Sequence, residues 1–298
     1  MRCRYFTVRM RQLCILSLLL VFLPAPQLLA GSDRQQGLLW EIAAPGQPPG
    51  YLFGTIHSGA PAVLALPEPV QQRFDAVDSV VLEVLLDLDA MRYSSQLMLL
   101  AEGRLLSDIT GKVLFEQTSR AIRSRGIPEA VLERMKPWAA AVTLSMPPPE
   151  AGEVLDMKLY QQALQAGKQV YGLESIREQL AIFDDMPEQE QLLLLRDAVE
   201  NFAEIEAIQG ALIDAWLQRN LCALLAINDA AMQTADRQQA VELQDKLIVR
   251  RNRLMAERLQ PYLQEGNVFV AVGALHLPGE AGLLNLLQQR GYTVRVIY

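Results

Sequence analysis

The chain has 298 residues, of which 51% are hydrophobic, and its formal net charge at pH 7 is −7. This length and composition suffice for one large domain or two small ones, and they exclude a disordered chain for the bulk of the sequence. An acidic chain without a basic stripe binds the nucleic-acid backbone poorly, so we predict no nucleic-acid partner.

Residues 1–30 have the organisation of a secretory signal peptide. A basic segment without acids, Met1–Gln12, precedes the apolar run Leu13–Leu23, and small residues around Ala30 offer a cleavage site. The apolar run is shorter than the roughly 20 residues of a membrane span, which favours a cleaved signal over an uncleaved anchor. We therefore predict a periplasmic or secreted protein with no stable membrane span after cleavage.

The segment after the signal predicts a hairpin and a strand–helix–strand unit. Leu38–Ile42 and Tyr51–Phe53 are expected as strands on either side of a turn rich in Pro and Gly. The motif Gly54-Thr55-Ile56-His57 follows, and then a helical stretch to about Ala76. The apolar, β-branched run Ser79–Val84 is typical of a buried parallel strand.

The middle of the chain, residues 90–265, is predicted to be mostly helical. One strand, Gln169–Glu174, interrupts the helices, and a long periodic helix is expected over Asp236–Gln260, with Pro261 past its end. Because no stretch has the composition of a linker, we treat this region as a helical cap inserted into one α/β domain of residues 31–298.

The C-terminal residues repeat the N-terminal unit. Val268–Val272 is a predicted strand, Gly273-Ala274-Leu275-His276 a turn, Glu280–Arg290 a helix and Thr293–Ile297 a closing strand. Parallel crossovers are almost always right-handed, so both Gly-x-x-His turns are expected at the carboxyl ends of their strands, at one sheet edge. The predicted fold class is α/β, with a central mixed, largely parallel sheet built from two such units and a large helical insertion.

The only two histidines of the chain, His57 and His276, both stand in Gly-x-x-His motifs after predicted strands. We expect Gly54 and Gly273 to end the strands by allowing a backbone turn that residues with side chains resist. Imidazole is the commonest metal ligand and the usual proton carrier near neutral pH. A packed or capping histidine is the alternative for either residue alone, but two matching motifs favour a functional pair.

Glu83 is the natural third member of this group. It is an acid inside an apolar run, where a buried charge requires a metal or a cationic partner; an acid at a solvated strand end is the alternative. Glu174 has a similar place in the next strand, and Asp156 is a further candidate polar contact. Two histidines and one carboxylate with open positions would hold a divalent cation and an activated water molecule.

Arg251 and Asn252 lie in a dense basic patch, Arg250–Arg253. An arginine beside an amide would bind a substrate carboxylate or an oxyanion, whereas a solvated face paired with acids is the alternative. The sequence contains no serine nucleophile elbow, phosphate-binding loop, dinucleotide fingerprint or His-Glu-x-x-His helix, so nucleotide chemistry and a serine nucleophile are not supported.

Several of these segments together resemble the TraB/GumN family, which is related to the Tiki metalloproteases. The resemblance spans nearly the whole chain after residue 30 and rests on Leu39–Ile42, Tyr51–His57, Val81–Glu83, Lys136–Trp138, Asp156–Gln165, Gly167–Glu174, Arg251-Asn252 and Val268–Gly279. It implies an α/β fold shared with erythromycin esterase-like and haem-binding ChaN-like proteins. It also implies a metal-dependent, peptidase-like site with Mn or Co as the activating ion and Zn as a further option.

By motif match, the resemblance assigns His57, Glu83 and His276 to the metal-binding and catalytic group. It assigns Arg251 and Asn252 to substrate contacts. The sequence thus predicts an exported, divalent-metal-dependent hydrolase of the peptidase type that acts on a peptide or a small molecule.

Two alternatives use the same residues. One is a non-catalytic exported protein that sequesters a peptide or a haem, and the other is a metal-free His/Glu hydrolase similar to an esterase. Asp87 departs from the family pattern, because relatives often place an acid sooner after the strand glutamate, and its role stays open at this stage.

Overall fold

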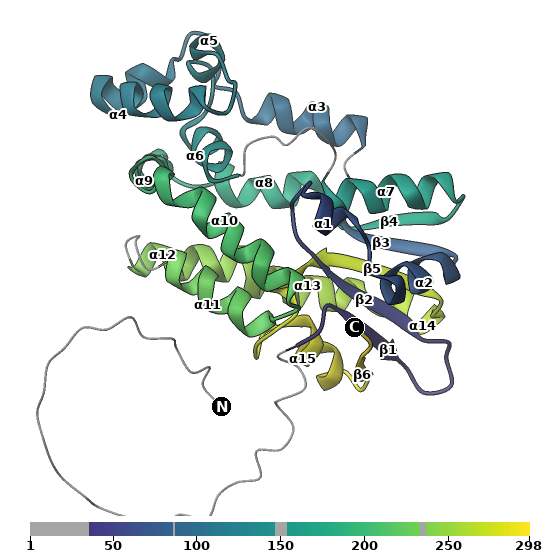
Figure 1. The fold of residues 1–298 in the computed structure, drawn as a ribbon. Helices are drawn as coiled ribbons and strands as arrows, with labels where there is room; N and C mark the ends of the chain where they lie inside the picture. Colours follow the sequence, from purple (N-terminus) through teal and green to yellow (C-terminus); the bar gives the residue numbers. More distant parts are fainter. Residues whose placement is uncertain (1–35, 86, 147–153, 233–236) are drawn as a thin grey trace, which may run out of the picture.

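The computed structural model describes residues 36–85, 87–146, 154–232 and 237–298, so the predicted signal peptide lies outside the described residues. Strands form one six-stranded mixed sheet in the order β4-β3-β5-β2-β1-β6 (Figure 1). Their bounds are β1 Leu39–Ala43, β2 Gly50–Thr55, β3 Ser79–Val84, β4 Gln169–Glu174, β5 Val268–Gly273 and β6 Thr293–Val296.

Four neighbouring strands, β4, β3, β5 and β2, run parallel, whereas β1 is antiparallel to both β2 and β6. Every residue of β5 from Val268 to Val272 is buried, which accounts for its unbroken apolar sequence. The predicted hairpin is confirmed by the β1–β2 pair, and the predicted mixed, largely parallel sheet is confirmed as well.

The register places the two motif-bearing strand ends next to each other. In the parallel β2–β5 pair, Thr55 stands opposite Gly273. On the other side of β5, strand β3 pairs with it as far as Leu82 opposite Ala271, so Glu83 follows at the same edge. Strand pairing thereby brings the ends of β2, β3 and β5, which are far apart in the sequence, to the same edge of the sheet.

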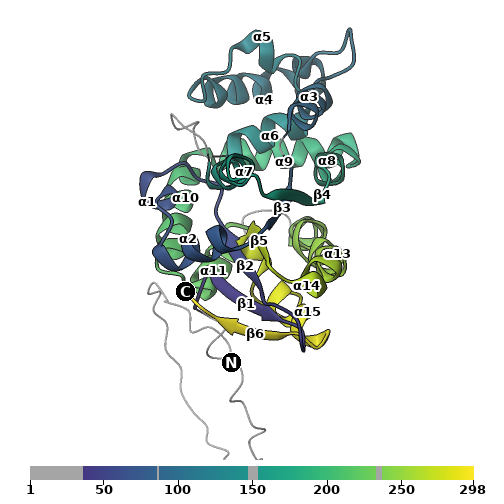
Figure 2. The ribbon, with the colours of Figure 1, turned by 90° about the vertical axis from the view of Figure 1, so that its right-hand side faces the viewer.

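Helices cover both faces of the sheet, with α2 on one side and α13, α14 and α15 on the other (Figure 2). Phe269 of β5 contacts Phe53 of β2 and Phe74 of α2, with ring centroids 5.9 and 5.3 Å apart. We call the buried residues around the sheet the sheet core. The helices near it are α1 Pro61–Leu64, α2 Glu68–Ala76, α7 Leu155–Gln165, α13 Arg250–Arg258, α14 Gln260–Glu265 and α15 Leu283–Gln289.

A second group of buried residues, which we call the helical core, lies between α4, α5, α6 and α9. It includes Leu132, Trp138 and the consecutive alanines Ala139–Ala141. The remaining helices are α3 Leu88–Leu97, α4 Leu106–Arg123, α5 Glu129–Leu132, α6 Pro137–Ser145, α8 Ile176–Asp184, α9 Glu188–Glu200, α10 Phe202–Leu217 and α11 Leu221–Met232. The predicted helical insertion is therefore present, whereas the domain limits 31–298 stay a prediction.

The helix predicted over Asp236–Gln260 is divided into several segments. Helix α12, Arg237–Gln244, passes into a π-helical turn over Asp245–Val249, and α13 follows. Helix α14 then begins at Gln260 with Pro261 in its first turn. Proline is tolerated there because N–H groups in the first turn of a helix form no intrahelical hydrogen bond. Pro261 thus lies past the end of α13, as predicted, and also stands in the first turn of a new helix.

Candidate active site

The two Gly-x-x-His motifs pack against each other where β2 and β5 end. A Cβ built on Gly54 would stand 3.0 Å from the Cα of Ala274 and 2.7 Å from Cδ1 of Leu277. Neither Gly54 nor Gly273 is among the glycines with a positive φ, so the expected need for backbone freedom at these positions is wrong. Close packing requires the glycine at 54, whereas Gly273 supplies an N–H group to the site.

His276 is buried and held by an amide from α13. Its Nδ1 lies 2.6 Å from Oδ1 of Asn252, while Nδ2 of Asn252 donates to the carbonyls of Ala281 at 2.8 Å and His276 at 3.3 Å. Because the amide nitrogen faces two acceptors, Oδ1 is the acceptor and Nδ1 of His276 carries the proton. Burial lowers the pKa of His276. The neutral ring therefore presents the lone pair of Nε2.

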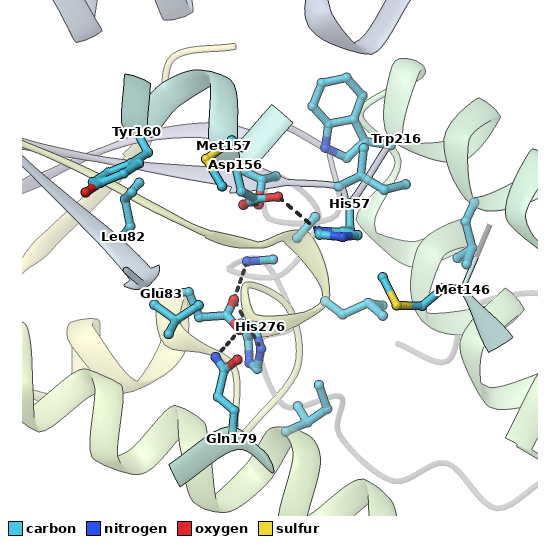
Figure 3. A pocket seen from close by; sticks show the side chains of 18 of the residues that line it. His57, Leu82, Glu83, Met146, Asp156, Met157, Tyr160, Gln179, Trp216 and His276 are labelled. Carbon is cyan, nitrogen blue, oxygen red and sulfur yellow. Dashed lines mark hydrogen bonds and ion pairs between the residues drawn. The ribbon is translucent and has the colours of Figure 1, made fainter. Parts of the chain in front are cut away.

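Glu83 stands opposite that lone pair, with Oε2 at 3.8 Å from Nε2 of His276. Oε2 accepts the N–H of Gly273 at 2.9 Å, and Oε1 accepts from Arg251 at 2.5 Å and from Gln179 at 3.1 Å (Figure 3). Burial raises the pKa of Glu83, but attraction to His276 in its protonated form, attraction to Arg251 and the hydrogen bond from the Gly273 N–H outweigh burial, and the net pKa is about 2. Glu83 is therefore a carboxylate at neutral pH.

Arg251 joins the ends of β3 and β4. Its guanidinium also donates to both oxygens of Glu174 at 2.6 to 3.1 Å, and the Glu174 side chain is only 2% exposed. Arg251 and Asn252 were predicted as substrate contacts, but here their bonds go to Glu83, Glu174 and His276. Neither side chain lines the pocket described below.

Gln179 of α8 is a site residue that the sequence analysis missed. Its Nε2 bridges Glu83 at 3.1 Å and Glu174 at 3.2 Å. A capping box formed by Ser175 and Glu178 starts α8 directly after β4 and so fixes where Gln179 points. The capping pattern is visible in the sequence, but nothing in it marks Gln179 as a contact of the strand acids.

His57 lies at the rim, with its side chain 49% exposed. Its Nδ1 is 3.7 Å from Oδ2 of Asp156, and the other oxygen of Asp156 accepts a hydrogen bond of 2.7 Å from Thr55. Pairing with Asp156 raises the pKa of His57, against the opposing effect of burial. Asp156, proposed from sequence as a polar contact, thus orients the first histidine as Asn252 orients the second.

A pocket of about 500 Å³ opens between these groups and the helices. Figure 3 shows His57 and Asp156 on one side of the cavity and Glu83, His276 and Gln179 on the other. The three residues predicted as the metal-binding and catalytic group therefore all line one pocket. Asp87 is not among the lining residues; its side chain caps α3 by accepting the Ala90 N–H at 2.8 Å.

Imidazole and carboxylate donors suit Mn, Co or Zn, so the residue types fit a divalent metal. Nδ1 of His276 is hydrogen-bonded to Asn252, which leaves Nε2 as the ring atom that could bind a metal, while Nδ1 of His57 faces Asp156 at 3.7 Å. Within the described part of the chain, however, no three His, Cys, Asp or Glu side chains are grouped closely enough to hold an ion. His57 with Asp156 and His276 with Glu83 form two separate pairs.

A model of the TraB/PrgY/gumN family matches residues 38–296. The metalloprotease TIKI2 of Danio rerio is 26% identical over an alignment of 310 positions, gaps included, that covers 86% of this chain and 60% of the length of that relative. The uncharacterized protein YbaP is 24% identical in Shigella flexneri and in Escherichia coli strain K12, over 83% of this chain and 91% of each relative.

No solved structure matches the chain. Among the helices of the described residues, none combines the length and the apolar character needed to cross a membrane.

Proposed function

Because the chain belongs to the TraB/PrgY/gumN family, we propose that it is an exported, divalent-metal-dependent hydrolase of the peptidase type. Two Danio rerio relatives, TIKI2 and TIKI1, carry the name metalloprotease, which supports this activity at the level of the family. Export rests on the signal peptide predicted for residues 1–30. The observation that carries the proposal is the pair of His276 Nε2 and Glu83 Oε2, 3.8 Å apart in the wall of the pocket.

Two electron-rich atoms that face each other at this distance are stabilised by a positive or hydrogen-donating group between them. Asn252 fixes the proton of His276 on Nδ1, and a partner that orients a histidine in this way is the usual support of a metal ligand. Arg251 keeps Glu83 ionised, as a ligand must be. Arg251 and Asn252 therefore act in this proposal by positioning other groups.

From the sequence prediction we keep His57, Glu83 and His276 as the residues that would hold the ion, with Mn or Co as the ion and Zn as the alternative. Because His57 lies in a separate pair from Glu83 and His276, this assignment requires the two pairs to approach each other when the ion binds. When bound, the ion would polarise a carbonyl group and acidify a water molecule. Asp156 faces His57 at 3.7 Å, on the opposite side of the pocket from Glu83 and His276 (Figure 3). A peptide carbonyl placed in the pocket would lie between His57 and Asp156 on one side and Glu83 and His276 on the other.

A metal-free hydrolase is the second candidate, and a specific observation favours it. Three N–H groups, from Arg251, Gln179 and Gly273, already occupy acceptor positions of Glu83. If these hydrogen bonds keep Glu83 from binding a metal, His57, which is paired with Asp156 and has a raised pKa, would transfer the proton as a general acid–base. Turnover would then persist in a chelator and disappear in His57→Ala.

Metal content and affinity test the first proposal. Elemental analysis and calorimetry with Mn, Co and Zn are expected to give stoichiometric binding by the wild type and none by His57→Ala or His276→Ala. Glu188→Gln, which changes a carboxylate that pairs with Arg104 outside the pocket, is the matched control and should bind as the wild type does. A well-folded wild type that binds none of the three ions would remove the metal mechanism.

A further inference from the structure

Around the polar groups, the same pocket is lined by apolar side chains (Figure 3), and we call this apolar part of the pocket the chamber. Its walls come from β3, from the C-terminal end of α6 and from α7 and α10, and they include Leu82, Met146, Met157, Tyr160, Leu212 and Trp216. The whole pocket, at about 500 Å³, has the size of a cavity that binds small molecules and is much larger than an ion with its water requires. The additional space therefore faces part of a substrate.

The charges that line the pocket are already paired within the protein. Glu83 is paired with Arg251, and Asp156 lies between His57 and Thr55. His276 is held by the hydrogen bond between its Nδ1 and Oδ1 of Asn252. A charged substrate side chain entering the chamber would lose its hydration without meeting an unpaired countercharge.

We infer that the chamber binds an apolar side chain of the substrate, of the size of leucine, methionine or phenylalanine, beside the bond that is hydrolysed. This inference rests on the proposed function, because it names the substrate class of that same site. An apolar side chain gains free energy in proportion to the area that it removes from water. Recognition thus depends on apolar contact, whereas the reaction depends on the polar pairs.

The walls combine fixed and adaptable side chains. Trp216 is 3% exposed, and its Nε1 donates to the carbonyl of Gly54 at 2.9 Å, which ties the chamber to the first histidine motif. Phe53 supports the indole ring from the sheet, with centroids 6.2 Å apart. Met146 and Met157 are unbranched and polarisable, so they adjust to side chains of different shape. The chamber should therefore discriminate by polarity more than by shape.

Binding measured without turnover tests the inference. Acetylated, amidated pentapeptides of the form Ala-Ala-X-Ala-Ala, with X as Leu, Met, Phe, Lys or Glu, are titrated calorimetrically into the chelator-treated protein. The three apolar peptides are expected to bind at least about tenfold more tightly than the two charged ones. Met146→Lys, at a side chain that is 41% exposed and tolerates a charge, should remove most of this preference. Leu164→Lys, on α7 but outside the pocket and 52% exposed, is the control and should keep it.

Equal binding of all five peptides, tighter binding of Lys or Glu, or the same result for Met146→Lys and Leu164→Lys would overturn the inference. Hydrolysis of the leucine peptide with added Mn or Co is recorded separately. An apolar binding preference without hydrolysis would support the chamber and count against the proposed function. Hydrolysis of all five peptides at equal rates would support the proposed function and count against the chamber.

Discussion

The sheet core and the helical core organise their surroundings by different means. Around the sheet, large aromatic and branched side chains such as Phe53 and Phe269 are fully buried, and strand pairing sets the positions of Glu83 and His276. The helical core combines large side chains such as Trp138 with the small residues Ala139–Ala141, and helix packing alone sets their positions. The reactive groups and most of the pocket's apolar wall belong to the sheet core or pack against it, whereas the helical core meets the pocket at Leu180. Changes in the helical core should therefore disturb the site less than changes in the sheet core.

The most severe test of this contrast removes the cation at the sheet edge. Arg251→Met leaves the carboxylates of Glu83 and Glu174 buried without a cation, so the free energy of unfolding should fall by about 3–5 kcal/mol. Arg295→Met, in the exposed pair with Glu41, should cost less than about 1 kcal/mol. Urea denaturation measures both, and equal losses would show that the paired charges of the site have no special weight.

A matched pair of leucine truncations separates the two cores. Leu132 of the helical core and Leu52 of the sheet core are both at most 1% exposed, and each change to alanine should cost about 2–5 kcal/mol. Hydrogen exchange should show faster exchange confined to α4–α6 and α9 in Leu132→Ala, but throughout the sheet in Leu52→Ala. Uniform acceleration in both variants would mean that the cores open as one unit.

The motif glycines provide a finer test on the sheet side. Gly54→Ala brings a Cβ within 2.7 Å of Leu277 and should cost about 1–3 kcal/mol through overpacking. In Gly273→Ala the nearest atoms are 3.5 Å away and φ is −53°, so stability should change by less than about 1 kcal/mol. Thermal unfolding of both variants measures the two losses of stability. A larger loss of stability in Gly273→Ala than in Gly54→Ala would contradict the packing argument.

The smallest effect concerns the pair that links α8 to α13. Hydrogen bonds from Arg258 and Ser175 lower the pKa of Glu178 from 4.5 to about 2, so its stabilising contribution is present above pH 4.5 and is lost as the pH falls towards 2. The pair is partly exposed, which limits this contribution to less than about 1 kcal/mol. The stability difference between wild type and Glu178→Gln should therefore shrink between pH 7 and pH 3. If the stability difference between wild type and Glu178→Gln did not vary with pH, the ion pair of Glu178 and Arg258 would not contribute to stability.

Strand positions were readable from the sequence because buried parallel strands need unbroken apolar runs. Gln169–Glu174 and Ser79–Val84 have the predicted bounds, and the parallel register then brings both Gly-x-x-His turns to one edge. Side-chain direction was not readable, because it depends on the packing of helices distant in sequence. For this reason Arg251 was expected to face a substrate and Gln179 was missed, although both contact Glu83.

The π-helical turn over Asp245–Val249 has a consequence for how this site can change. It contains Ile248, which lines the pocket, and it directly precedes the helix that carries Arg251, which contacts the strand glutamates. One residue more or less in a helix rotates everything beyond it by roughly 100° about the axis. A single-residue deletion here would turn Arg251 and Asn252 away from their contacts without substituting either. The length of this turn thus determines which side chains of α13 face Glu83, Glu174 and His276.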